Sequence, residues 1–174
     1  MRKTNPSEKG KTSLDRLVHP FPPLWSQNSR ALILGSFPSI QSREQQFYYG
    51  HPQNRFWKVL STLYHEKIPE TIKEKKSLIL SHDLALWDSI GSCIISGSAD
   101  ASIRDAQPND ISPLLKNAPI QRIFCNGTMS YRLYEKCILP LTKREAIYLP
   151  STSPANARWT LDQLVKAWSV ILES

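Results

Sequence analysis

Cysteine is scarce in this chain of 174 residues, with Cys93, Cys125 and Cys137 far apart from one another. An odd number without paired spacing does not suit a disulfide framework or a metal site, and an iron–sulfur cluster normally takes four thiolates. Cys125 lies in an apolar run, where a cysteine acts as a small core residue. We therefore expect a reducing compartment, the cytoplasm.

Long apolar runs are missing as well. No stretch approaches the roughly 18 consecutive apolar residues of a membrane span, so we expect no membrane association. The polar start of the chain also lacks the apolar stretch of a secretory signal. It carries five basic and two acidic residues, and we predict a disordered basic arm over residues 1–16 and a single domain over residues 17–174.

Negative charge is in the minority. The formal net charge is +7 and the sequence pI is about 9.4. Such a balance suits a polyanionic partner, although many soluble proteins are mildly basic. Hydrophobic residues make up 40% of the chain, which is enough to build a core at this length.

Four short apolar runs end in polar or turn-forming residues, as buried strands of a parallel sheet do. They cover residues 31–34, 84–87, 122–125 and 146–149. Segments with helical spacing separate them. The sequence therefore predicts an α/β fold, a three-layer α/β/α sandwich around a central, mainly parallel four-stranded sheet.

Capping residues and proline predict where the helices begin and end. Helical segments are expected to begin near Asn54, Thr71, Thr128 and Thr160. The last one opens with a capping-box pattern, Thr160 with Gln163. We expect the helix after Thr128 to end before Pro140, because proline lacks the backbone N–H that a helix interior needs.

Ligands of such a fold bind beyond the carboxyl ends of the strands, which singles out the loops that begin at Gly35, Asp88 and Pro150. The first loop, residues 35–57, is rich in aromatic residues. A flat ring can be held there by stacking, a role that we assign to Tyr49. Phe56 and Trp57 lie on the helix face and are expected to pack beneath the loop.

This loop resembles the uracil-DNA glycosylase superfamily. The resemblance lies in a strand followed by Gly-Ser-Phe-Pro, then an aromatic residue and His-Pro-Gln-Asn-Arg-Phe-Trp-Lys-Val-Leu, and it extends over roughly residues 30–172. Mismatch-specific uracil glycosylases match from Gly35 to Asn54 without a gap, but have a catalytic Asn where this chain has Phe37. The motif is closer to the deoxyinosine (hypoxanthine) glycosylase branch.

The resemblance implies that Asn54 takes the catalytic role, because in that branch the Asn of this segment is thought to do so. Asn is also a strong helix N-cap, and the two roles are compatible. We expect Asn54 to orient the attacking water through its side-chain oxygen. The base-binding residues expected from this loop are Gly35, Ser36, Phe37, Pro38, Tyr49 and His51; for His51, a backbone hydrogen bond that fixes the loop is the alternative.

In the second loop, the resemblance aligns Asp88 with the position that reads the edge of the flipped base. A carboxylate accepts hydrogen bonds, so Asp88 can take the N1–H of hypoxanthine, whereas adenine has no proton at N1. The alternative is that Asp88 caps the following turn. Further along this segment, Ser98, Ala99 and Asp100 are expected only to shape the loop.

The third loop, residues 149–159, corresponds to the superfamily's Leu-Pro-(His or Asn)-Pro-Ser motif and DNA wedge. Ser151 and Ser153 fall on the polar positions of that motif and are expected to bind substrate. Asn156, Ala157 and Arg158 are expected to contact DNA, with Arg158 supplying charge to phosphates. The missing His or Asn removes a donor to the departing base and argues against efficient uracil excision.

The resemblance implies a monofunctional DNA N-glycosylase that flips out hypoxanthine and hydrolyses it from double-stranded DNA. We expect a monomer without metal or cofactor, associated with the nucleoid if the source is prokaryotic. The alternatives are a uracil or mismatch-specific glycosylase, an inactive DNA-binding domain of the same fold and an unrelated nucleoside-binding α/β enzyme.

Overall fold

A computed structural model of the protein describes residues 15–97 and 99–173. The predicted disordered arm, residues 1–16, lies outside the described residues as far as residue 14. Its last residue, Arg16, already belongs to the first strand, β1 (Arg16–Val18). Arg16 therefore belongs with the folded domain, one position before the expected boundary.

The centre of the molecule is a parallel sheet of four strands in the order β3-β2-β6-β7. The strands are β2 (Ala31–Gly35), β3 (Leu84–Asp88), β6 (Arg122–Asn126) and β7 (Ile147–Leu149). Each corresponds to one of the four apolar runs. The central strand β2 is buried on both faces, as parallel strands usually are, whereas Tyr148 on the edge strand β7 is exposed. The predicted sheet is confirmed.

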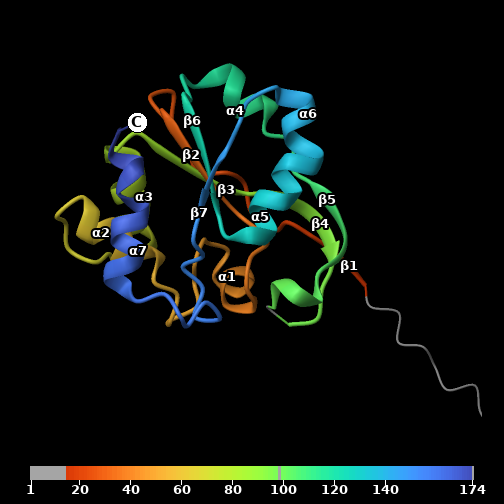
Figure 1. Cartoon of the computed structure of the whole chain (residues 1–174), viewed down its shortest axis with the longest axis horizontal. Helices are drawn as coiled ribbons and strands as arrows, with labels where there is room; N and C mark the ends of the chain where they lie inside the picture. The colour runs from red at the N-terminus through yellow and green to blue at the C-terminus, as the bar shows by residue number, and fades with distance from the viewer. Residues whose placement is uncertain (1–14, 98, 174) are drawn as a thin grey trace, which may run out of the picture.

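Helices cover both faces of this sheet (Figure 1). On one face lie α2 (Phe56–Leu63), α3 (Ile72–Ser81) and α7 (Leu161–Trp168), which continues into the turn η3 (Ser169–Glu173). On the other lie α4 (Ser112–Asn117), α5 (Thr128–Leu133) and α6 (Leu139–Thr142). Alternate residues of β2 join the two cores, Ile33 with the first group and Leu32 with the second. The three-layer sandwich is confirmed.

A second, antiparallel sheet was not predicted. It has the order β1-β4-β5, with β4 (Ile90–Ile94) and β5 (Arg104–Pro108), and the short turn η1 (Asp100–Ser102) precedes β5. These strands read IGSCI and RDAQP, without the apolar run or strict alternation that would mark them. A short helix, α1 (Ile40–Gln45), in the first loop was also missed.

The helical path after β6 differs from the expectation. Gly127 rather than Thr128 is the N-cap of α5, and the path continues through a π-helical turn, η2 (Tyr134–Ile138), into α6. Pro140 therefore does not end it. The proline lies in the first turn of α6, where its missing N–H removes no hydrogen bond from that helix.

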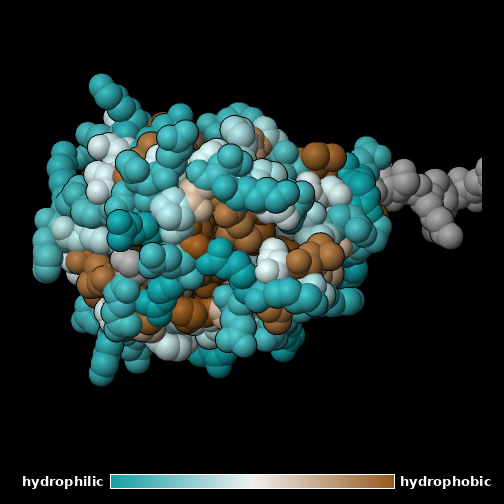
Figure 2. Space-filling view, turned by 90° about the horizontal axis from the view of Figure 1, so that it is seen from above, coloured by the Kyte–Doolittle hydropathy of each residue, from teal (hydrophilic) through white to brown (hydrophobic). Residues whose placement is uncertain are grey.

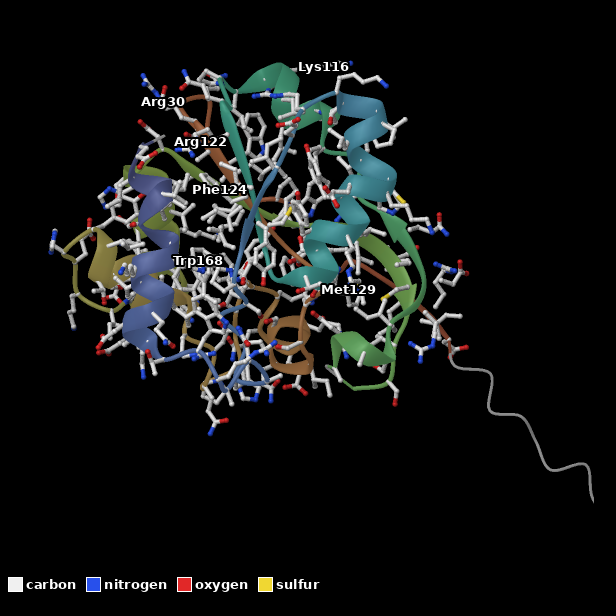
Figure 3. All side chains as sticks on the ribbon, viewed as in Figure 1. Arg30, Lys116, Arg122, Phe124, Met129 and Trp168 are labelled. Atoms are coloured by element: carbon white, nitrogen blue, oxygen red, sulfur yellow. The ribbon has the colours of Figure 1, made fainter. Side chains whose placement is uncertain are left out.

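Polar and apolar surfaces are distributed unevenly. Seen from above the view of Figure 1, hydrophilic residues dominate the periphery and hydrophobic residues appear near the centre (Figure 2). Arg30, Lys116 and Arg122 lie at that upper end, around the beginnings of the strands, whereas Met129 lies toward the opposite end (Figure 3). Within residues 15–97 and 99–173, no helix combines the length and apolarity needed to cross a membrane.

Trp168 holds α7 to the sheet. Its side chain is fully buried, its indole Nε1 donates to Pro150 O at 3.0 Å, and its ring lies edge-on to Phe56. We predict that Trp168→Ala lowers the free energy of unfolding by about 3–5 kcal/mol, because it leaves a large cavity and an unpaired carbonyl. Urea unfolding measures this loss. Leu172→Ala, at a half-exposed side chain, should change it by less than about 0.5 kcal/mol.

Candidate active site

A cavity of about 470 Å³ opens at the carboxyl ends of the parallel strands. All three predicted loops contribute to it, as does the end of β6. Eleven of the thirteen predicted site residues line it: Gly35, Ser36, Phe37, Pro38, Tyr49, Asn54, Asp88, Ser151, Ser153, Asn156 and Arg158. Met129, which also lines it, marks this end of the molecule in Figure 3. A volume of this size suits a small organic ring.

Gly35 ends β2 and leaves room for two polar side chains. A Cβ atom at this position would lie only 2.3 Å from Asp88 Oδ1 and 3.2 Å from the Tyr49 hydroxyl. The backbone fixes this corner, since Ser89 N donates to Gly35 O and Ile90 N to Ser36 O. The glycine thus lets a carboxylate and a phenol converge on the same spot of the cavity wall.

Tyr49 stacks on Phe56, with ring centroids 3.8 Å apart and planes 17° from parallel. Its backbone lies in the left-handed region (φ 51°), an uncommon conformation for a non-glycine residue. The hydroxyl is buried without a well-formed hydrogen bond to the described residues. Burial raises the pKa of this phenol, the negative charge of Asp88 adds to the effect, and the nearby Asn126 side chain opposes it. Tyr49 is therefore a protonated phenol at the cavity wall that can donate to a ligand.

Asp88 is buried and is held from behind by a histidine. His19 Nε2 lies 2.6 Å from Asp88 Oδ2, while His19 Nδ1 lies 2.8 Å from Phe21 O. The other carboxylate oxygen, Oδ1, makes no hydrogen bond with the described residues and lies beside Gly35. The capping hydrogen bond that was the alternative role of Asp88 is absent among those residues, and one oxygen remains available to a ligand.

Asp100 brings a second carboxyl group to the rim of the cavity, beyond its expected role of shaping the loop. Ser36 Oγ donates to Asp100 Oδ1 at 2.7 Å, joining η1 to the first loop. Although the residue is exposed at the rim, desolvation of its carboxyl raises the Asp100 pKa. The hydrogen bond from Ser36 opposes this rise and the charge of Asp88 adds to it.

Asn54 is the last member of a buried hydrogen-bond chain. Asn126 Nδ2 donates to Thr152 Oγ1 at 3.0 Å, and Thr152 Oγ1 donates to Asn54 Oδ1 at 2.9 Å. Phe56 N donates to the same oxygen at 3.0 Å, although Arg55 and not Asn54 is the N-cap of α2. Both lone pairs of the amide oxygen are thus used. The Asn54 NH₂ group has no hydrogen-bond partner among residues 15–97 and 99–173, and it is the part of the side chain left for substrate.

Arg55 fixes the third loop to the start of α2. Its guanidinium donates to four backbone carbonyl oxygens, those of Thr152, Ser153, Asn156 and Trp159. The Arg55 backbone N–H also donates to Thr152 O, at 3.0 Å. A planar guanidinium has five donors in fixed directions, so one side chain can set the path of the whole loop.

The remaining predictions for the third loop divide into two groups. Ser151 and Ser153 each accept a backbone N–H two residues further on, and Asn156 Nδ2 donates to Ser151 O. Asn156 is thus folded back into its own loop, whereas Arg158 is exposed at the cavity. Ala157 is exposed and does not line the cavity.

His51 also lies outside the cavity lining. Its Nδ1 accepts the backbone N–H of Gln53 at 3.1 Å, which agrees with the loop-fixing alternative. Phe37 is buried in a small cluster with Ile90 and Cys93 while its edge reaches the cavity. Its aromatic ring offers no hydrogen-bonding group in place of the superfamily's amide.

Sequence reasoning missed His19, Arg55, Asn126 and Thr152 as parts of the site. The signal for Asn126 was present: it ends a buried parallel strand, just as Gly35 and Asp88 do. The others depend on contacts between distant segments. In residues 15–97 and 99–173, no group of three or more His, Cys, Asp or Glu side chains is arranged to hold a metal ion.

Known proteins match this chain over most of its length. The model of the uracil DNA glycosylase superfamily matches residues 22–172. A hypoxanthine DNA glycosylase from Methanosarcina acetivorans is 35% identical over 141 residues, covering 80% of this chain and 89% of that protein. A second one, from Methanosarcina barkeri, is 34% identical over 140 residues, covering 79% and 87%.

A solved structure agrees. The solution NMR structure of a candidate uracil DNA glycosylase from Methanosarcina acetivorans superimposes with a TM-score of 0.75 at 31% identity, covering 91% of this chain and all of that one. Family match, relatives and fold point the same way, and the chain belongs to the uracil DNA glycosylase superfamily.

Proposed function

We propose that this protein removes hypoxanthine from deoxyinosine in double-stranded DNA by hydrolysis, leaving an abasic site. Its relatives that carry the name hypoxanthine DNA glycosylase support this substrate. None of the described lining residues is a lysine. This favours attack by water over an enzyme-bound imine, and hence a monofunctional glycosylase.

The observation that carries the proposal is the acceptor and donor that converge over Gly35. Asp88 Oδ1 can accept the N1–H of hypoxanthine, and the Tyr49 hydroxyl can donate to its O6. Adenine presents the opposite pattern, an acceptor at N1 and a donor at N6. A base read in this way binds when deaminated and is rejected when normal, because buried polar groups would otherwise stay unpaired.

The nucleotide first flips out of the duplex into the cavity, which costs a few kcal/mol, and hydrolysis then takes place there. The N-glycosidic electrons leave with the base while positive charge develops on the sugar, and the oxygen of water bonds to C1′. The proton that the water loses balances the one that the departing base gains, exchanged through solvent. With its oxygen engaged by Phe56 and Thr152, Asn54 acts through its NH₂ group rather than through the oxygen as first expected. As a donor, it can hold the water by one lone pair or stabilise the departing base.

Uracil excision is the second candidate, because uracil offers the same edge, N3–H beside O4. The cavity does not exclude the smaller ring. An inactive DNA-binding domain is the third, and the unpaired groups of Tyr49, Asp88 and Asn54 argue against it. Binding to the DNA backbone alone would not need these three groups to line one cavity.

Asn54→Ala tests the chemistry. Duplexes that contain deoxyinosine or uracil are incubated with the protein, and alkali then cleaves any abasic sites. We expect the variant to lower the rate of hypoxanthine release by about 100-fold or more. Gln53→Ala, at the exposed neighbouring position, should stay within about threefold of the unsubstituted protein. Release of uracil alone would refute hypoxanthine as the substrate, and release of neither base would favour the binding domain.

Tyr49→Phe tests the base-edge donor. It keeps the stacking on Phe56 and removes only the hydroxyl, so kcat/KM for deoxyinosine should fall by about 10-fold, the worth of roughly one hydrogen bond. Tyr131→Phe on α5, outside the cavity lining, is the matched control and should leave kcat/KM unchanged. If kcat/KM for Tyr49→Phe is unchanged, the hydroxyl does not take part in base recognition and Tyr49 acts through its ring alone.

Arg158→Ala tests the direction from which DNA approaches. Loss of one phosphate contact should weaken binding to duplex DNA and reduce the slope of log K against log salt by about 1. Arg30→Ala removes the same charge at the opposite end of the molecule (Figure 3) and should change neither quantity. Equal effects of the two substitutions would mean that net charge, rather than this face, determines binding.

A further inference from the structure

His19 is a buried histidine that belongs to no predicted motif. It follows β1 and precedes residues 22–172, the stretch that the family model matches. Its side chain is 3% exposed and that of Asp88 is 7% exposed, with 2.6 Å between His19 Nε2 and Asp88 Oδ2. The two groups are 69 positions apart in the sequence.

The hydrogen bonds of the ring fix its protons. Nδ1 lies 2.8 Å from Phe21 O, and a carbonyl oxygen can only accept, so Nδ1 carries a hydrogen. Nε2 faces a carboxyl oxygen, and that contact also needs one proton between the two atoms. With the proton on His19, the pair is an imidazolium and a carboxylate, and Asp88 Oδ1 is a pure acceptor.

The surroundings favour a strong, local interaction. Phe21, Phe37 and Trp87 surround the imidazole, with ring centroids 4.6, 6.0 and 6.4 Å away. Such a setting excludes water and strengthens a charge pair relative to one at the surface. It also makes removal of one partner costly, because the other charge is then buried alone.

Four other groups complete the electrostatic setting of the pair. Burial raises the pKa of the phenols of Tyr48 and Tyr49 and of the Asp100 carboxyl, and the charge of Asp88 adds to each rise. These groups are neutral or negative in every protonation state. Arg43 contacts Phe37, with its guanidinium carbon 5.9 Å from the ring centroid. Among the described residues, His19 is the one basic side chain within ion-pair distance of Asp88.

We propose that His19 is a positioning and specificity-determining residue that keeps Asp88 an oriented, ionised acceptor for the N1–H of the flipped base. The proposal rests on the proposed function. His19 engages Oδ2 and thereby leaves Oδ1 for the base. Without the imidazolium, a buried carboxyl favours its neutral acid form, whose O–H can donate to the bare N1 of adenine.

The first test replaces His19 with Phe, which fills the aromatic surroundings and supplies no proton. At neutral pH, kcat/KM for a deoxyinosine duplex should fall 100-fold or more. The preference for deoxyinosine over deoxyadenosine, measured as the ratio of the two kcat/KM values, should fall too. Affinity for a duplex with a tetrahydrofuran abasic-site analogue should stay within threefold, since it presents no base to read.

His82→Gln is the matched control. His82 Nε2 lies 2.6 Å from Glu66 Oε1 in a more exposed histidine–carboxylate pair away from the cavity, so none of these quantities should change. An equal loss of abasic-site affinity in His19→Phe would reduce His19 to a structural role, and unchanged kcat/KM would overturn the proposal. An unsubstituted protein that releases no hypoxanthine would instead refute the proposed function.

The second test needs no activity and no His19 variant. Nitrogen-15 NMR of the histidine side chains should find hydrogens on both Nδ1 and Nε2 of His19 in the unsubstituted protein. Asp88→Asn should remove the hydrogen from Nε2, because the neighbouring negative charge is gone. A bare Nε2 in the unsubstituted protein would place the proton on Asp88 and overturn the proposal.

Discussion

The site depends on the guanidinium of Arg55 and on the backbone carbonyl groups to which it donates hydrogen bonds. Arg55 donates to four carbonyl oxygens of the loop after β7, and so holds in one shape a segment without a sheet ladder or helix of its own. The same loop carries Thr152, which donates to Oδ1 of Asn54. Asn54 directly precedes Arg55 in the sequence. The candidate catalytic amide and the loop that faces DNA are therefore positioned by neighbouring residues of one helix start, and neither can shift without the other.

The parallel sheet provides the second constraint. Because all four strands run the same way, Gly35, Asp88 and Asn126 arrive at a single edge, and the loop after Leu149 joins them there. Gly35 supplies space, Asp88 supplies a carboxylate and Asn126 supplies an amide. Most positions around the cavity are tied to one another, and the few polar atoms left free, Asp88 Oδ1, the Tyr49 hydroxyl and the Asn54 amide nitrogen, face the same volume.

How much of the structure the sequence could predict depends on whether each signal is local in the sequence or comes from contacts between distant residues. Apolar runs and capping boxes are local, so the four strands and the capped starts of α3 and α7 were predictable. The second sheet was not, since Gly91 and Ser92 weaken any strand pattern in β4. Asn54 was identified through its motif, but the direction in which its amide works depends on Thr152, 98 positions away, and no spacing rule covers that pairing.

The N-terminal strand has a consequence for how such proteins are compared. β1 and the residues after it place an imidazole against Asp88, yet they lie before residue 22, where the match to the family begins. Two chains with identical cavity loops can therefore differ in the base they accept if they differ in this leading segment. Grouping superfamily members by their loop motifs alone would put such chains in one class, although under the proposed role of His19 they would differ in the electrostatics of base recognition.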